Sequence, residues 1–120
     1  RAGADALAAV AGAYRGYIKQ HPGLYLASLT ASGQQAAPDA ELAAAEERVV
    51  RVVLAVLASL GVTGDDAIHA TRGLRSIVHG FATLEIAGGF GLPLDCDESF
   101  RRLLHIWLAG LQATSGNKER

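Results

Sequence analysis

The stretch from residue 65 to residue 111 holds more apolar surface than one small core can bury. Residues 65–87 follow the spacing of a helix that is apolar on two faces. One face carries Ala67, Ala70, Leu74, Ile77, Val78, Phe81 and Leu84, and the other carries Ile68, Arg75, His79, Ala82 and Ile86. Two such faces predict two partners, one within the subunit and one outside it.

A glycine-rich but apolar bend follows this helix. Gly88 and Gly89 are expected to end the helix, and residues 91–93 to turn the chain. Asp95 and Asp97 open a last helix, whose N-terminal end is favoured by their negative charge. The apolar stripe of this helix comprises Phe100, Leu103, Leu104, Trp107, Leu108 and Leu111. An apolar bend would be poorly placed in water, so we expect a symmetric four-helix bundle, with two helices from each subunit, to cover it.

The rest of the chain is also predicted to be helical, without any convincing alternating strand. A first helix runs from about residue 5 to residue 20, with Arg15 and Lys19 on the face opposite its apolar residues. Pro22 starts a short second helix. Residues 32–39 are the clearest loop, with Asp39 as a candidate N-cap, and a long third helix follows to Leu60. The sequence therefore predicts an all-α fold of five helices.

Composition limits the classes of protein that this chain can represent. It has 120 residues, half of them hydrophobic, and a formal net charge of −1, so it lacks the basic footprint of a nucleic-acid binder. A single cysteine, Cys96, permits no disulfide within the chain and fits a reducing cytoplasm. The longest apolar run, residues 52–62, is too short to cross a membrane. Because neither a methionine nor a signal peptide is present, we expect a cytoplasmic piece of a longer protein.

Three tyrosines and a histidine cluster around the end of the first helix. Tyr14, Tyr17, His21 and Tyr25 would suit a pocket in which hydroxyl and imidazole groups orient a mostly apolar ligand. The alternative is that the tyrosines are half-buried packing residues with their hydroxyls in water, and that His21 occupies a helix junction.

Two polar residues stand out on the two-faced helix. His79 has three possible settings, which are the cavity, the dimer seam or a hydrogen-bonded structural position. Arg75, one turn earlier, has a similar choice. It can pair with Glu85 of a partner helix, pair with an acidic effector, or remain solvated.

The sequence predicts neither a metal site nor a catalytic site. The histidines and Cys96 show no CxxC spacing and no histidine pair four residues apart. Ser76 and His79 share a helix face, but no carboxylate is spaced to complete a triad. We therefore expect a protein that is not an enzyme and that uses no cofactor or metal.

Residues 74–111, LRSIVHGFATLEIAGGFGLPLDCDESFRRLLHIWLAGL, resemble the end of the C-terminal domain of TetR-family transcriptional regulators. The likeness is greatest to the subgroup named for a W-H-G motif. His79–Gly80 and Leu84–Glu85 stand in register with that motif, although the residue before His79 is not aromatic. Residues 13–28, AYRGYIKQHPGLYLAS, resemble the opening of the same domain, where a helix ends at His-Pro and an aromatic residue follows.

The resemblance implies a five-helix TetR-type C-terminal domain over residues 1–120. It implies a homodimer built on the last two helices, an effector cavity among the earlier ones, and an N-terminal helix-turn-helix domain absent from this chain. Operator DNA would be contacted only through that missing domain. An effector that favours one cavity shape would change the spacing of the two recognition helices and hence DNA affinity. The expected function is a repressor controlled by a small apolar effector.

We expect two sites, an effector site and a dimer interface. The effector site is expected to contain Tyr14, Tyr17, His21, Tyr25, Leu54, Leu57, His79 and Phe81. The dimer interface is expected to contain Arg75, Ala82, Ile86, Phe90, Leu92, Phe100, Leu104, Trp107 and Leu108. A stand-alone helical interaction protein is the alternative, and there the inner faces of Tyr14, Leu54, Leu57 and Phe81 would close on one another without a cavity. The sequence does not specify the effector, the operator, or repression as opposed to activation.

Overall fold

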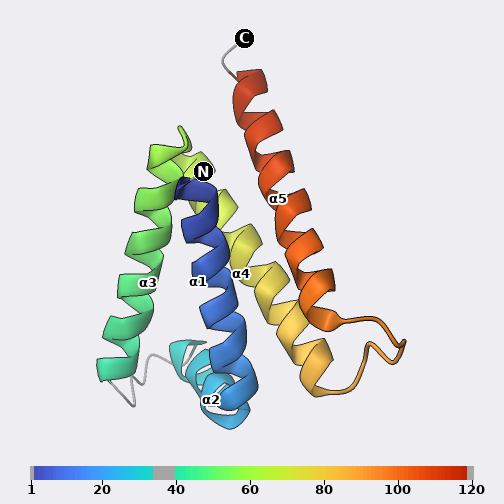
Figure 1. The fold of residues 1–120 in the computed structure, drawn as a ribbon. Helices are drawn as coiled ribbons and strands as arrows, with labels where there is room; N and C mark the ends of the chain where they lie inside the picture. Colours follow the sequence, from blue (N-terminus) through green and yellow to red (C-terminus); the bar gives the residue numbers. More distant parts are fainter. Residues whose placement is uncertain (1, 34–39, 119–120) are drawn as a thin grey trace.

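The chain folds into five α-helices in a computed structural model (Figure 1). The structure describes the backbone of residues 2–33 and 40–118, and the side chains of residues 2–29 and 44–115. The helices are α1 (Ala2–Gln20), α2 (Pro22–Gly33), α3 (Ala40–Ser59), α4 (Gly64–Ile86) and α5 (Cys96–Lys118). No strand occurs within these ranges, which confirms the all-α prediction. The predicted loop begins inside α2, and residues 34–39, including the candidate N-cap Asp39, lie outside the described residues.

Helix α1 is the central element of the domain. It contacts each of the other four helices, and it lies between α3 and α4 in Figure 1. The apolar residues of α1 recur every three or four positions, and this spacing places them on the face toward the core. The largest fully buried side chains are Ile18 of α1, Leu57 of α3 and Val78 of α4. Any displacement of α1 therefore reaches every other helix.

Two glycines end α4 and turn the chain toward α5. Gly88 adopts φ +73°, a left-handed conformation that a residue with a Cβ atom rarely takes. Its N–H donates to the carbonyl of Glu85 at 3.1 Å, and the N–H of Gly89 donates to the carbonyl of Leu84 at 2.7 Å. These two hydrogen bonds form a Schellman motif. The predicted role of Gly88 and Gly89 as helix terminators is confirmed.

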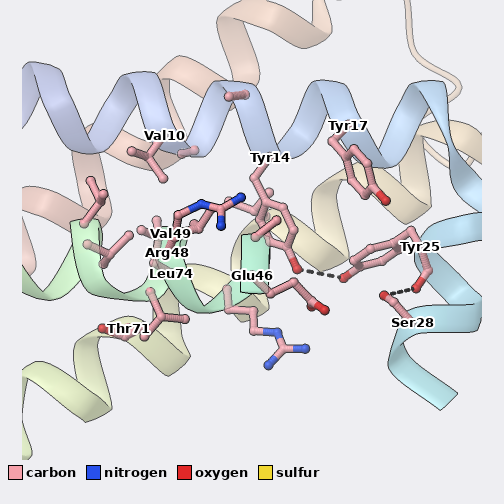
Figure 2. Close-up of a pocket in the computed structure, with 18 residues that line it drawn as sticks. Val10, Tyr14, Tyr17, Tyr25, Ser28, Glu46, Arg48, Val49, Thr71 and Leu74 are labelled. Carbon is pink, nitrogen blue, oxygen red and sulfur yellow. Dashed lines mark hydrogen bonds between the residues drawn. The ribbon is translucent and has the colours of Figure 1, made fainter. Parts of the chain in front are cut away.

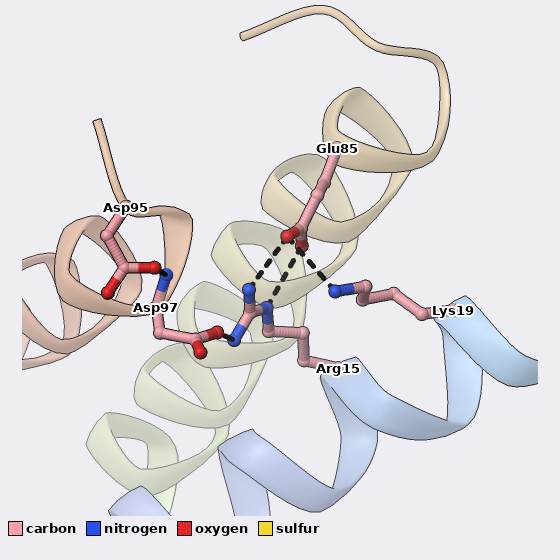
Figure 3. A network of polar contacts seen from close by, with 5 residues as sticks. All are labelled: Arg15, Lys19, Glu85, Asp95 and Asp97. Carbon is pink, nitrogen blue, oxygen red and sulfur yellow. Dashed lines mark hydrogen bonds and ion pairs between the residues drawn. The ribbon is translucent and has the colours of Figure 1, made fainter. Parts of the chain in front are cut away.

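One arginine joins α1 to both helices of the α4–α5 hairpin (Figure 3). Arg15 donates two hydrogen bonds to the Glu85 carboxylate, at 3.0 and 2.8 Å, and a third to Asp97 Oδ1 at 2.8 Å. Its guanidinium lies over the rings of Phe81 and Phe100, 5.3 and 4.9 Å from their centroids. Only 11% of the Arg15 side chain and 14% of the Glu85 side chain is exposed. The planar guanidinium of Arg15 thus links α1 to both α4 and α5 at one point.

Glu85 is occupied within the chain itself. The Nζ of Lys19 also donates to Glu85, at 3.1 Å. The hydrogen bond from Arg15, followed by that from Lys19, outweighs burial and lowers the pKa of the Glu85 carboxyl. Glu85 is therefore paired with α1, and the idea that it meets Arg75 of a second subunit does not fit these contacts.

The hairpin of α4 and α5 runs along one side of the molecule, and the last turns of α5 extend beyond the other helices (Figure 1). The expected interface residues fall into two groups. Ala82 and Phe100 are buried in the core of the single chain, and Phe90, Leu104, Trp107 and Leu108 are half-buried against that core. Ile86 and Leu92 are exposed. The apolar stripe of α5 thus faces inward, because the subunit needs it to complete its own core.

Other apolar side chains form the outer surface of the hairpin. Leu84, Leu94 and Ile106 are 51%, 77% and 68% exposed, together with Ile86 and Leu92. Within the described ranges, no helix combines the length and the apolar character needed to cross a lipid bilayer.

Candidate ligand pocket

A pocket of about 720 Å³ lies among α1, α2, α3 and α4 (Figure 2). This volume is typical of sites that enclose a small organic ligand. The pocket is partly open to solvent, and most of its lining is apolar. The wall comprises Val10, Ala11, Ala13, Tyr14, Tyr17, Tyr25, Ser28, Ala45, Glu46, Arg48, Val49, Val50, Val52, Val53, Thr71, Leu74, Arg75 and Val78.

The two ends of the pocket differ in chemistry. Val10, Val49 and Leu74 lie toward one end in Figure 2, whereas Tyr17 and Tyr25 lie toward the other. Helical spacing produces this arrangement, because residues three and four positions apart share one face of a helix. The pocket can therefore hold a ligand with an apolar body and a polar group.

A chain of hydrogen bonds orders the polar end. Tyr14 Oη donates to Tyr25 Oη at 3.3 Å, and Tyr25 Oη lies 2.5 Å from His79 Nδ1. The rings of Tyr14 and Tyr25 meet edge to face, with centroids 5.9 Å apart. Burial, with a smaller contribution from the hydrogen bond of Tyr14, raises the pKa of Tyr25. Tyr25 therefore remains a neutral phenol, held from behind the pocket wall by His79.

Tyr17 contributes a buried hydroxyl that has no hydrogen-bond partner among the described residues. A buried polar group without a partner loses its hydration without compensation, at a cost of about 1–3 kcal/mol. We expect Tyr17→Phe to leave the free energy of unfolding unchanged or to raise it by up to about 1 kcal/mol. Tyr25→Phe should instead lower it, because two hydrogen bonds are lost. Urea denaturation measures both, and equal losses for the two variants would contradict this description of Tyr17.

Comparison with known proteins assigns the chain to a family. Residues 7–106 match the model of the tetracyclin repressor-like C-terminal domain. The chain belongs to this family. It is 36% identical over 114 residues to the uncharacterized HTH-type transcriptional regulator Rv0681 of Mycobacterium tuberculosis, an alignment covering 93% of this chain and 50% of the relative. It is 32% identical over 118 residues to the uncharacterized HTH-type transcriptional regulator YobS of Bacillus subtilis, covering 98% and 59%.

These matches confirm the TetR-family resemblance read from residues 13–28 and 74–111. The chain is a TetR-like C-terminal domain of the kind found in transcriptional regulators. It spans between 50% and 59% of the length of these two relatives.

The TetR-like domain places the predicted effector residues in different settings. Tyr14, Tyr17 and Tyr25 line the pocket. His79 reaches the pocket only through its contact with Tyr25. His21 is exposed at the junction of α1 and α2, where its backbone N–H donates to the backbone carbonyl of Tyr17 at 2.9 Å. The junction setting of His21 was the alternative to a role in the pocket.

Three predicted pocket residues lie elsewhere. Leu57 is fully buried in the core, and Leu54 is half-buried against it. Phe81 packs on Phe90 and Phe100, with ring centroids 4.7 and 5.1 Å apart, at the α4–α5 corner. The physical reason is that these three side chains pack in or against the hydrophobic core next to the pocket, so they do not form part of its wall.

The structure also brings residues to the pocket that were not expected there. Arg75, assigned to the dimer interface, lines the pocket with Glu46, Arg48 and Thr71. Thr71, Leu74, Arg75 and Val78 line the pocket from one face of α4, so the prediction that Arg75 lies on a different face from Leu74 and Val78 is wrong. Their spacing of three and four residues was the available signal. The described residues contain no group of three or more His, Cys, Asp or Glu side chains suited to holding a metal ion.

Proposed function

We propose that this domain binds a small, mostly apolar effector in the pocket and dimerises through the outer face of the α4–α5 hairpin. The effector would control DNA binding by an N-terminal helix-turn-helix domain of the same regulator, acting as a repressor. The names of both relatives, HTH-type transcriptional regulators, and their greater length support that domain arrangement.

The observation that carries the proposal is the pocket of about 720 Å³. A domain that served only for helical packing would fill such a space, because protein interiors are close-packed. The alternative without a cavity requires Tyr14 to pack tightly against the inner helices, whereas Tyr14 lines the pocket.

The outer face of the hairpin supports dimerisation. Leu84 and Ile106 are large and exposed, and each lies one turn from a glycine, Gly80 on α4 and Gly110 on α5. A Cβ atom built on either glycine would meet nothing within 4 Å. Small residues beside exposed apolar ones allow two helices to approach closely, and a two-fold symmetric contact would cover the same patch on both subunits.

Helix α1 offers a physical route between the two sites. Tyr14 lines the pocket, while the next residue, Arg15, binds Glu85 and Asp97 on the hairpin. A ligand that shifts α1 would therefore act on the contact that orients α5. Such coupling requires the ligand to bind one arrangement more tightly than the other.

Binding of the neutral fluorophore N-phenyl-1-naphthylamine tests the pocket. We expect Val49→Trp, which adds an indole to the pocket wall, to weaken binding at least roughly tenfold because it occupies ligand space. Ala55→Trp is the matched control, since Ala55 is an exposed residue of α3 outside the pocket wall. Fluorescence titration gives both affinities. Equal binding by the two variants, or none by the wild type, would refute the proposed site.

A further inference from the structure

Two arginines line the pocket, and neither has a counter-ion among the described residues. Arg48 extends from α3 and Arg75 from α4. Within the described part of the chain, neither side chain forms an ion pair or a hydrogen bond, unlike Arg15, Arg101 and Arg102. Both are exposed, so they keep water until a ligand arrives.

Among the described residues of this wall, Glu46 is the one carboxylate. Glu46 lies two residues before Arg48 on α3, a spacing at which helical side chains do not face each other. Two arginines and one glutamate leave a net charge of +1 on the pocket wall. Burial is the main reason that the pKa of Tyr25 is raised, and the nearby charge of Arg75 opposes this rise while that of Glu46 adds to it.

Arg48 lies beside the apolar end of the pocket rather than far from it. Figure 2 shows Arg48 next to Val49 and Leu74, and Glu46 between that end and Tyr25. An apolar ligand seated there would remove water from Arg48. Cations that lose water without gaining a partner oppose binding, whereas a carboxylate matches the guanidinium fork.

We infer that the effector is a singly charged anionic amphiphile, a carboxylate whose head group is bound by Arg75 and Arg48 and whose aliphatic or aryl body packs against Val10, Val53 and Leu74. This inference rests on the proposed function of the pocket. Glu46 favours one negative charge over two, because a second would not be neutralised by the wall. A cationic head group would be repelled by both arginines.

A series of ten-carbon ligands tests the charge of the head group. Isothermal titration calorimetry at about 50 mM salt and pH 7.5 compares decanoate, decanol, decylammonium and decyl phosphate. We expect decanoate to bind up to roughly fivefold more tightly than decanol, as one exposed ion pair predicts. Decylammonium should bind more weakly than decanol, and decyl phosphate no more tightly than decanoate. The preference for decanoate should shrink as salt rises.

Matched variants locate the charges. Arg75→Gln and Arg48→Gln should each weaken decanoate binding several-fold and leave decanol binding unchanged. Arg72→Gln and Arg51→Gln are the controls, because these exposed arginines sit on the same two helices outside the pocket wall. Glu46→Gln should have the opposite sign and tighten decanoate binding, whereas Glu47→Gln, also outside the wall, should not.

Several results would overturn the inference. Decanol binding as tightly as decanoate would do so, as would a loss for Arg72→Gln equal to that for Arg75→Gln, or tightest binding of decyl phosphate. If N-phenyl-1-naphthylamine binds in the pocket and decanoate does not, the anionic effector is excluded while the proposed function stands. If neither ligand binds, both fail together.

Discussion

Replacing Arg15 by methionine is expected to lower the free energy of unfolding by about 2 kcal/mol, roughly a thirtyfold change in the ratio of folded to unfolded protein. The substitution keeps an apolar side chain of similar length but removes three hydrogen bonds to Glu85 and Asp97. It also leaves Glu85 largely buried with only Lys19 as its partner. Urea denaturation at a fixed protein concentration, with Arg101→Met as control, measures the effect.

Arg101 serves as the control because its ion pair is largely exposed, whereas that of Arg15 is largely buried. Arg101 also binds a carboxylate, that of Glu98, but its side chain is 66% exposed, so Arg101→Met should leave the free energy of unfolding nearly unchanged. Comparable losses for Arg15→Met and Arg101→Met would show that the buried network contributes no more than a surface pair.

The pairing of Arg15 with Glu85 also predicts how the stability lost in Arg15→Met depends on pH. The folded state lowers the pKa of Glu85, whose ordinary value is 4.5, chiefly through the hydrogen bond from Arg15. A lowered carboxyl pKa stabilises the fold above the unfolded value, and this stabilisation is lost as pH falls through the folded value. The difference between wild type and Arg15→Met should therefore be full at pH 7 and should shrink below about pH 4.5. A difference that grows in acid would contradict the assignment.

Replacing Ile106 by aspartate is expected to weaken dimerisation at least about 100-fold. The side chain is 68% exposed on the outer face of α5, where the proposed dimer would bury it. Two-fold symmetry places the new charge in the interface twice, and an unpaired buried carboxylate is strongly unfavourable. Light scattering should give twice the chain mass of 12.5 kDa for the wild type and the chain mass for the variant.

A control separates this effect from loss of folding. Ala55→Asp introduces the same charge on an exposed position of α3, away from the hairpin, and should leave the dimer intact. Circular dichroism should show equal helix content in both variants. A wild-type chain that stays monomeric at micromolar concentration, with its helices formed, would refute the hairpin interface.

The helices could be predicted because apolar periodicity and chain-breaking glycines are local signals. Val49, Val53 and Leu57 recur every four residues along α3 and show the limit of this local signal. Leu57 lies in the core and Val49 lines the pocket, although both belong to one apolar pattern. Which part of a wide stripe faces a cavity depends on how α1 and α3 cross, and that is a property of the packed fold.

The candidate site likewise contains residues that could be predicted from the sequence and residues that could not. Tyr14, Tyr17 and Tyr25 were expected at a pocket because an aromatic ring with a polar tip suits its edge. The sequence pattern predicts Arg15 on the face of α1 away from the core, whereas only 11% of its side chain is exposed. Its partner Glu85 is 70 residues away, beyond the reach of spacing arguments. The excess of apolar residues in the last two helices predicts Phe100 at a dimer interface, yet the core of the single chain buries it.

The pocket can be tested directly through the few aromatic residues of the chain. All three tyrosines line it, whereas the single tryptophan, Trp107, lies on α5 outside its wall. Carbon-13 labelling of tyrosine and tryptophan rings gives separate NMR signals for the two places during titration with N-phenyl-1-naphthylamine. We expect saturable shifts of the tyrosine signals, larger than any shift of Trp107. Tyrosine signals that stay fixed while Trp107 moves would contradict this expectation.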